Sequence, residues 1–217
     1  MSLFVDVSYH EGQIDWRRAY DAGVREAYIR FATGGKRNAG DLEFVPNCYG
    51  ASMLMEPDFR WSVYHVPAIA DKDDVKFQAG LFVEVLNILR QWTDLRYEYD
   101  MPPCGDWEAF QSLLVSKNRA FAISYYEEVS GGIGLAPGVY TRASWWNRWM
   151  GTKPTGIEKY SFLWLAQPGP GGVATSIPPT VPAAWKAAGK SWDLHQFSWK
   201  GIVPGIPGEC DLNRRAS

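Results

Sequence analysis

Four acidic residues stand within or beside short apolar segments, and they are the side chains best suited to chemistry. Asp6 lies in LFVDVS, Asp106 and Glu108 lie in GDWEAF, and Asp211 lies in CDLN. On a β-strand, residues i and i+2 point to the same side about 6.5 to 7 Å apart, with the residue between them, here Trp107, turned away. Like charges so placed raise one pKa, and a protonated carboxyl beside an ionised one is what glycoside hydrolysis requires.

The same residues also allow simpler interpretations. An Asp-x-Glu triplet is common by chance, and Glu108 could instead be the first-turn acid of a following helix, where it would favour the positive end of the helix dipole. Asp6 and Asp211 could be turn residues or salt-bridge partners. The catalytic interpretation therefore needs a fold that brings all four acids together.

Apolar runs typical of strands recur along the chain, and helical patterns separate the early ones. We expect strands at Leu3–Val7, Glu26–Ala32, Trp61–Val66, Asp106–Phe110, Val139–Thr141, Phe162–Gln167, Asp193–Ser198 and Cys210–Asn213. We expect helices at Asp15–Ala22, capped by Asp15 and ended by Gly23, at Glu43–Met55, with Pro46 in the first turn, and at Asp73–Trp92. The apolar face of the third comprises Phe77, Leu81, Phe82, Val85, Leu86, Leu89 and Trp92.

A fourth helix is expected after a loop at Asp94–Gly105 and the strand that follows it. Its shared face comprises Leu114, Phe121, Ala122, Tyr125 and Val129, and Gly131 and Gly132 are expected to end it. Pro168–Pro182 is rich in Pro and Gly and is interpreted as a surface loop.

This order of elements predicts an α/β fold, an irregular βα barrel formed by a single domain over residues 1–217, with loops joining most of the later strands. An open doubly wound sheet is the alternative. In both architectures the active groups collect at the carboxyl ends of the strands. The four acids would meet there.

Composition excludes several classes of function. The net charge is -2, from 22 basic and 24 acidic side chains, and the sequence has no dense run of basic residues of the kind that binds nucleic acid. No apolar run reaches the roughly 20 residues that span a bilayer, and the start of the chain does not have the pattern of a signal peptide. The cysteines, Cys48, Cys104 and Cys210, lack zinc-site spacing and are expected to be buried free thiols. With three histidines, no metal site or catalytic triad is supported, and His195 is expected to be packed rather than catalytic.

Seven segments together resemble the ordered motifs of the glycoside hydrolase family 25 lysozymes, which include phage endolysins. They are LFVDVSYHEG, YIRFATGG, VYHV, GDWE, PGVYT, LWLAQ and DLHQFSWKGIVPGIPGECDLN. The most specific are the opening DVS, the D-x-E strand and the closing G-x-x-G-x-x-D-L-N. The resemblance covers nearly the whole chain and implies a barrel of five βα units and three further strands.

The resemblance also implies a reaction and a set of roles. The expected activity is hydrolysis of the β-1,4 bond between N-acetylmuramic acid and N-acetylglucosamine in bacterial peptidoglycan, without metal or cofactor, by a monomer. Glu108 falls on the general acid/base, and Asp106 on the residue that assists the acetamido group of the substrate in a retaining route. Asp6 and Asp211 match acids that tune the cleft, and the cleft residues expected to bind substrate are Arg30, Tyr64, Tyr140 and Gln196.

The chain departs from the family pattern in three places. The usual Thr-Glu-Gly reads Thr33, Gly34 and Gly35, so one acidic neighbour is absent; Pro103, Cys104 and Gly105 precede the D-x-E pair; and a Trp-Gln-Tyr pattern reads His195, Gln196 and Phe197. These changes bear on substrate specificity more than on reaction type.

Two other classes of function stay open at this stage. One is a non-catalytic wall-binding or phage structural module with the same barrel, and the other is a metal-dependent hydrolase, which would need more histidine ligands. If the protein acts on the bacterial cell wall without a signal peptide, we expect lysis of the producing cell, by a phage or prophage, or another export route to deliver it.

Overall fold

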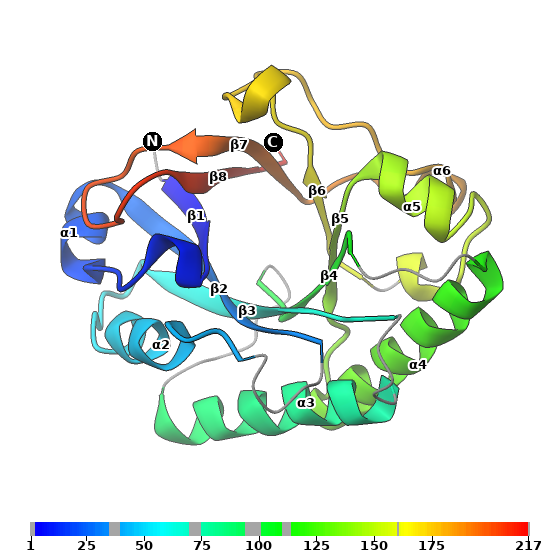
Figure 1. The fold of residues 1–217 in the computed structure, drawn as a ribbon, viewed down its shortest axis with the longest axis horizontal. Helices are drawn as coiled ribbons and strands as arrows, with labels where there is room; N and C mark the ends of the chain where they lie inside the picture. Colours follow the sequence, from blue (N-terminus) through cyan, green and yellow to red (C-terminus); the bar gives the residue numbers. More distant parts are fainter. Residues whose placement is uncertain are drawn as a thin grey trace.

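Eight strands form a closed barrel in which each strand pairs with its neighbours in sequence (Figure 1). The computed structural model describes residues 3–34, 40–69, 75–93, 101–109, 114–159 and 161–216. The first seven strands are parallel, and the last is antiparallel to both the seventh and the first. The predicted barrel is confirmed, and the open doubly wound sheet is wrong.

The strands lie close to the expected segments. Their bounds are β1 (Leu3–Val7), β2 (Val24–Thr33), β3 (Arg60–Val66), β4 (Cys104–Trp107), β5 (Gly138–Thr141), β6 (Leu163–Ala166), β7 (Leu194–Gly201) and β8 (Cys210–Arg215). The fourth differs most, because it begins two residues before Asp106 and ends one residue before Glu108. Asp94 to Asp100 of the expected loop, and Phe110, lie outside the described residues.

Helices lie outside the ring of strands (Figure 1). They are α1 (Trp16–Asp21), α2 (Phe44–Ser52), α3 (Val75–Trp92), α4 (Val115–Ile133), α5 (Ala143–Trp149) and α6 (Ala183–Ala187), with short 3-10 turns η1 (Tyr9–Glu11), η2 (Ile157–Lys159) and η3 (Pro170–Gly172). Asp15 caps α1 as predicted, since its side chain accepts from the Arg18 N–H. In the described part of the chain, none of these helices has the length and apolarity to span a membrane.

The buried face of α3 differs from the predicted one. Phe77 and Trp92 are 44% and 80% exposed, so their assignment to the core was wrong, and Asp73 lies outside the described residues. The buried positions are Gln78, Ala79, Phe82, Leu86 and Leu89. Gln78 is buried because its side-chain amide exchanges two hydrogen bonds with the backbone of Ala68. A polar side chain whose amide is hydrogen-bonded to the backbone can thus hold a core position that apolar patterning does not reveal.

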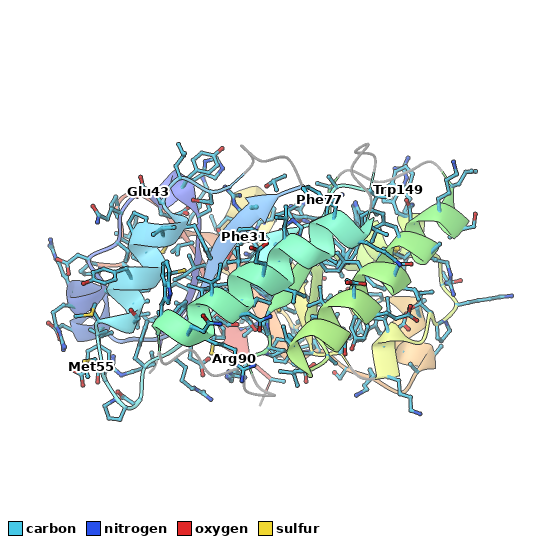
Figure 2. The ribbon with its side chains drawn as sticks, turned by 90° about the horizontal axis from the view of Figure 1, so that it is seen from below. Phe31, Glu43, Met55, Phe77, Arg90 and Trp149 are labelled. Carbon is cyan, nitrogen blue, oxygen red and sulfur yellow. The ribbon has the colours of Figure 1, made fainter. Side chains whose placement is uncertain are left out.

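The glycines of α4 pack instead of ending the helix. Gly131 and Gly132 lie inside α4, and the chain leaves the helix at Gly134, whose φ of 72° is left-handed. A Cβ on Gly132 would lie 2.4 Å from Cγ1 of Val83 in α3. The two helices lie side by side over the barrel, and this close approach explains the glycine (Figure 2). Leu114, expected on the buried face, is the N-cap and is 54% exposed.

Strand alternation divides the core into two parts. Outward side chains, such as Val5 and Val7 of β1, pack against the helices, whereas inward ones form a separate aromatic-rich cluster inside the barrel. This inner cluster includes Phe4, Tyr28, Tyr64, Tyr140, Phe162 and Trp164. The cysteines are buried free thiols, as predicted. The interior of the barrel is therefore filled by packed apolar side chains, and polar side chains can lie against this apolar layer.

Candidate active site

A pocket of about 270 Å³ opens among residues at the carboxyl ends of the parallel strands. All eight residues expected to act on substrate line it: Asp6, Arg30, Tyr64, Asp106, Glu108, Tyr140, Gln196 and Asp211. Val7, Ser8, His10, Glu11 and Trp164 complete the lining. The structure thus brings together residues that are more than 200 positions apart, although their chemical roles remain predictions.

Strand alternation explains why acids line this pocket. Phe4 and Asp6 both point inward from β1, so an aromatic ring is followed by a carboxylate one layer higher. In the antiparallel pairing of β1 and β8, Asp211 lies opposite Asp6. The indole of Trp164, stacked on Tyr28 at 4.7 Å, is part of the apolar layer beneath. The carboxylates therefore lie against a buried aromatic layer, where the ionised form is disfavoured.

The side-chain amide of Gln196 organises the strand ends. Its Nε2 donates to Asp6 at 3.1 and 3.2 Å and to Asp211 at 3.0 Å. Its Oε1 accepts from the hydroxyl of Tyr140 and from Nε1 of Trp199, each at 2.8 Å. Because both ends of the amide are used, the orientation of Gln196 is fixed.

Burial raises the pKa values of both Asp6 and Asp211. Burial raises the pKa of Asp6 to about 6, although hydrogen bonds from Asn213 and Gln196 oppose the shift. Burial also raises the pKa of Asp211, to about 9, and the charges of Asp6 and Glu11 add to the shift. A proton is therefore held on Asp211, from which it can be donated to the Asp6 carboxylate. Neither residue is a surface salt-bridge partner within the described chain.

Asp106, like Glu108, has a carboxylate oxygen without an aligned hydrogen bond among the described residues. It is 7% exposed, and its Oδ1 has no hydrogen-bond partner among the described residues. Burial raises its pKa well above the ordinary value, and the charges of Glu108 and Asp6 add to this, while Arg30 and Arg142 oppose it. A buried carboxylate oxygen without a partner is costly to the fold. Such an oxygen is available to a ligand.

Glu108 lies just beyond the end of β4, in a bend. The expectation that it shares a strand with Asp106 was therefore wrong, although Trp107 between them does turn away, against Phe121 and Tyr125 of α4. The helix-start interpretation does not hold either, because α4 begins at Val115. Burial raises the pKa of Glu108, and the charge of Arg142 opposes the shift.

Arg142 is a site residue that the sequence prediction missed. Its Nε lies 3.0 Å from Oε2 of Glu108, as an ion pair without hydrogen-bond alignment. Its guanidinium also lies 4.9 Å from the ring centre of Trp199. Arg142 directly follows the last residue of β5. The rule that singled out acids at strand ends would have found this cation as well.

Several other pocket residues serve mainly to hold their neighbours. Arg30 pairs with Asp41 at 3.1 Å and lies 4.9 Å from the ring centre of Tyr9. Glu11 accepts from the backbone and hydroxyl of Ser8 in a capping box around η1. Both contacts fix the chain that follows β1 and β2 at the rim of the pocket.

Two of the three histidines, His65 and His195, fit structural roles more than catalytic ones, whereas His10 lines the pocket. His195 is buried outside the pocket, with its ring nitrogens bonded to the Gln167 carbonyl and to Arg214. Burial lowers the pKa of His65 to about 4, and this ring contacts Tyr125 and the Gly34 carbonyl. Within the described residues there is no cluster of three or more His, Cys, Asp or Glu arranged to hold a metal. Gly35, the third residue of the altered Thr-Gly-Gly segment, lies outside the described residues.

Known proteins share this sequence pattern and this fold. Lysozyme M1 of Streptomyces globisporus is 25% identical over 219 residues, which cover 97% of this chain and 66% of that protein. This chain thus spans slightly less than two thirds of that relative's length. A bacterial lysozyme from Streptomyces coelicolor has a TM-score of 0.79 at 24% identity, with 100% of this chain and 92% of that chain covered. The catalytic domain of endolysin ply40, from a phage of Listeria monocytogenes, has a TM-score of 0.72 at 20% identity, over 100% and 94% of the two chains.

The family model described as Glycosyl hydrolases family 25 matches residues 5–206. The matched range includes Asp6, Asp106 and Glu108, while Asp211 lies beyond it. With a match over most of the sequence, and with the barrel and its acid-lined pocket in place, the chain belongs to the glycosyl hydrolases of family 25.

Proposed function

We propose that the protein is a muramidase that hydrolyses the β-1,4 bond between N-acetylmuramic acid and N-acetylglucosamine in bacterial peptidoglycan. The observation that carries this proposal is the pairing of Asp106 and Glu108 in one pocket, both with raised pKa values. Such a pair keeps a proton at a pH at which an isolated carboxyl would have lost it. This proton is what the departing sugar oxygen needs.

In the proposed first step, Glu108 gives its proton to the glycosidic oxygen as the bond from that oxygen to the anomeric carbon breaks. The carbonyl oxygen of the substrate's own acetamido group attacks the same carbon, and Asp106 holds the acetamido N–H. The pKa of Asp106 is raised well above its ordinary value in the free enzyme, but an N–H that donates to this carboxylate favours its ionised form and leaves the proton of the pair on Glu108. The unpartnered Oδ1 of Asp106 supports this role, because it lacks a donor within the described chain. The separation of the two carboxyl groups then does not set the stereochemistry, since the nucleophile belongs to the substrate.

In the proposed second step, the ionised Glu108 takes a proton from water, which attacks the anomeric carbon and opens the cyclic intermediate with overall retention. Asp6, as a carboxylate that accepts from Gln196 and from protonated Asp211, would stabilise positive charge that develops near the sugar ring, and Asp211 would position it. Arg30, Tyr64 and Tyr140 would position the glycan strand of the substrate. No step in this scheme uses a metal or a cofactor.

The proposal extends to the setting in which the chain works. We propose that residues 1–217 form one catalytic unit that acts on the bacterial cell wall as a monomer, without a nucleic-acid partner and without insertion into a membrane. The family membership and the lysozymes among the similar proteins support a cell-wall substrate.

The test is digestion of purified peptidoglycan, followed by borohydride reduction and mass analysis of the new ends. We expect reduced N-acetylmuramic acid at every new end, and Glu108→Gln at the same concentration is the control for contaminating hydrolases. Reduced N-acetylglucosamine, free stem peptides or no cleavage would each contradict the proposal. No cleavage would favour a non-catalytic wall-binding module.

A further inference from the structure

A second pocket of about 600 Å³ lies beside the catalytic one, and its lining includes residues at the start of α5, in the loop after β6, and in β7. Two contacts connect the pockets. Arg142, which lines the second pocket, pairs with Glu108 of the first, and Trp199, which also lines the second, donates to Gln196 of the first. The guanidinium of Arg142 lies over the ring of Trp199. Arg142 and Trp199 therefore stand between the two pockets.

The lining of the second pocket has the character of an anion site. Arg142 is its one charged residue, and every residue that lines it belongs to the described chain. Asn147 accepts from the Ala183 N–H and Gln167 accepts from the Thr180 N–H, each through the side-chain oxygen. Each of these amides therefore keeps its NH₂ group as a donor for a ligand. A pocket with a fork-shaped cation, amide donors and no carboxylate favours a carboxylate ligand.

We propose that the second pocket binds a carboxylate borne by the muramic acid units of the glycan strand, through Arg142. This inference rests on the proposed function. Two sources share the chemistry: the lactyl carboxyl of an unsubstituted muramic acid and the carboxyls of its peptide branch. Arg142 is 44% exposed at its side chain, so a ligand can reach the guanidinium without unfolding.

Binding of a carboxylate at Arg142 has a consequence for Glu108, because one guanidinium serves both groups. A ligand carboxylate bound to the same guanidinium partly neutralises the cation that favours ionised Glu108. The proton on Glu108 is then held more firmly in the complex than in the free enzyme. The other titratable or charged groups that line the pocket with Glu108 are Asp6, His10, Glu11, Arg30, Tyr64, Asp106, Tyr140 and Asp211, and none of them contacts the second pocket.

The experiment uses two matched pairs of soluble glycan strands. The first pair lacks peptides and carries the lactyl carboxyls either free or converted to methylamides. The second pair carries intact peptide branches whose carboxyls are either free or amidated. Wild type, Arg142→Gln and Arg142→Lys are assayed on each. Arg148→Gln is the matched control, since Arg148 lies on α5 outside both pockets and stacks on Trp149. Thermal unfolding of each variant is measured in parallel.

We expect wild type and Arg148→Gln to have a KM roughly tenfold lower for carboxylate strands than for amidated ones, the effect of one charge-assisted hydrogen bond. Arg142→Gln should show no preference, and Arg142→Lys a reduced one. A lower KM for the carboxylate form only among peptide-bearing strands identifies the peptide branch as the source. A lower KM for the carboxylate form among strands without peptides identifies the lactyl group. Equal KM values of wild type for free and amidated strands, or a preference kept by Arg142→Gln, would overturn the inference.

The pH profiles give a second readout that a merely structural role would not change. For wild type on carboxylate strands, the alkaline limb of kcat, which reports the complex, should lie at higher pH than that of kcat/KM, which reports the free enzyme. The two limbs should coincide on amidated strands and in Arg142→Gln. Coincident limbs for wild type on carboxylate strands would contradict the link to Glu108. If wild type cleaves none of the strands, the proposed function itself fails.

Discussion

At the end of the barrel where β2 and β3 begin, the buried Glu26 lies between two arginines. It pairs with Arg60 and, at 3.0 Å, with Nε of Arg215. At the opposite end, Asp106 and Glu108 lie close to other acids, and only Arg142 approaches Glu108 as an ion pair within the described chain. The same residue type is thus neutralised by cations at one end and placed among like charges at the other.

This difference separates stability from function. A buried acid with two cationic partners satisfies its charge, and at the amino ends of barrel strands such pairs support the fold. A group of acids that raise one another's pKa values costs free energy of folding, and such strain is typical of sites that move protons. Substitution of the paired acid at the amino ends of the strands should therefore lower stability and leave turnover unchanged. Substitution of the catalytic acids at the other end should lower turnover and leave stability largely unchanged.

The largest effect should come from Glu108→Gln. This change keeps size and polarity but removes the transferable proton, so turnover on peptidoglycan should fall by about 10² to 10⁴. Because Oε2 of Glu108 has no aligned hydrogen bond among the described residues, thermal unfolding should hardly change. Steady-state turnover and calorimetry measure both quantities. A variant that is fully active and less stable would remove Glu108 from the mechanism.

Asp106→Asn should also lower turnover strongly, by about 10-fold to 10³-fold, because a neutral amide stabilises positive charge less well than a carboxylate. The pH optimum should move as well, since the charge of Glu108 raises the pKa of Asp106 and the variant removes this interaction. A pH profile of kcat/KM for wild type and variant checks this. An unchanged optimum with normal turnover would limit Asp106 to a structural role.

Glu26→Gln should have the reverse signature. Removing one member of the buried charge group should destabilise the protein by about 1 to 3 kcal/mol, while turnover per folded molecule should stay close to that of wild type. Chemical denaturation beside the turnover assay measures it. If Glu26→Gln reduced turnover as much as Glu108→Gln does, the two ends of the barrel would not be distinct.

Asp211→Asn should stabilise the fold as the pH rises. The pKa of Asp211 is raised from 3.8 to about 9 in the folded protein, so ionisation is disfavoured there, and wild type loses stability between these two values. The asparagine cannot ionise but can still donate to Asp6. The variant should therefore gain at least about 1.4 kcal/mol over wild type between pH 4 and pH 8, the equivalent of one pKa unit. Equal slopes of stability against pH would contradict the raised pKa.

The smallest effect is expected from chelation. Activity should survive EDTA, because carboxyl groups alone supply the acid and the base in the proposed mechanism. Turnover before and after dialysis against EDTA is the measurement. Complete loss that zinc restores would show that the cofactor-free mechanism is wrong.

The barrel was predictable because its strands are short apolar runs and because carboxyl ends of parallel strands meet at one edge. For the same reason, Asp6, Asp106 and Glu108 could be placed together from sequence, whereas Asp211 joins them from the start of the antiparallel β8, opposite Asp6. Arg142 was missed because the search considered acids, although it follows β5 directly.

Other features depend on contacts that no local pattern contains. Gly132 resembles a helix stop, yet its place inside α4 follows from the approach of Val83 in α3. Gln78 can lie in the core because its amide exchanges two hydrogen bonds with the backbone of Ala68. The position of Glu108 beyond the end of β4 depends on where the pairing with β5 stops, at Trp107 and Thr141.

The central claim is that Glu108 is the proton donor to the leaving oxygen, and a substrate whose leaving group needs no proton tests it most directly. Glu108→Gln is assayed on peptidoglycan and on a muramoside with a dinitrophenolate leaving group. The account predicts a loss of about 10² to 10⁴ on peptidoglycan and a far smaller loss in formation of the intermediate on the activated substrate, read from the burst of dinitrophenolate. Equal losses on both substrates, or no loss on peptidoglycan, would contradict it.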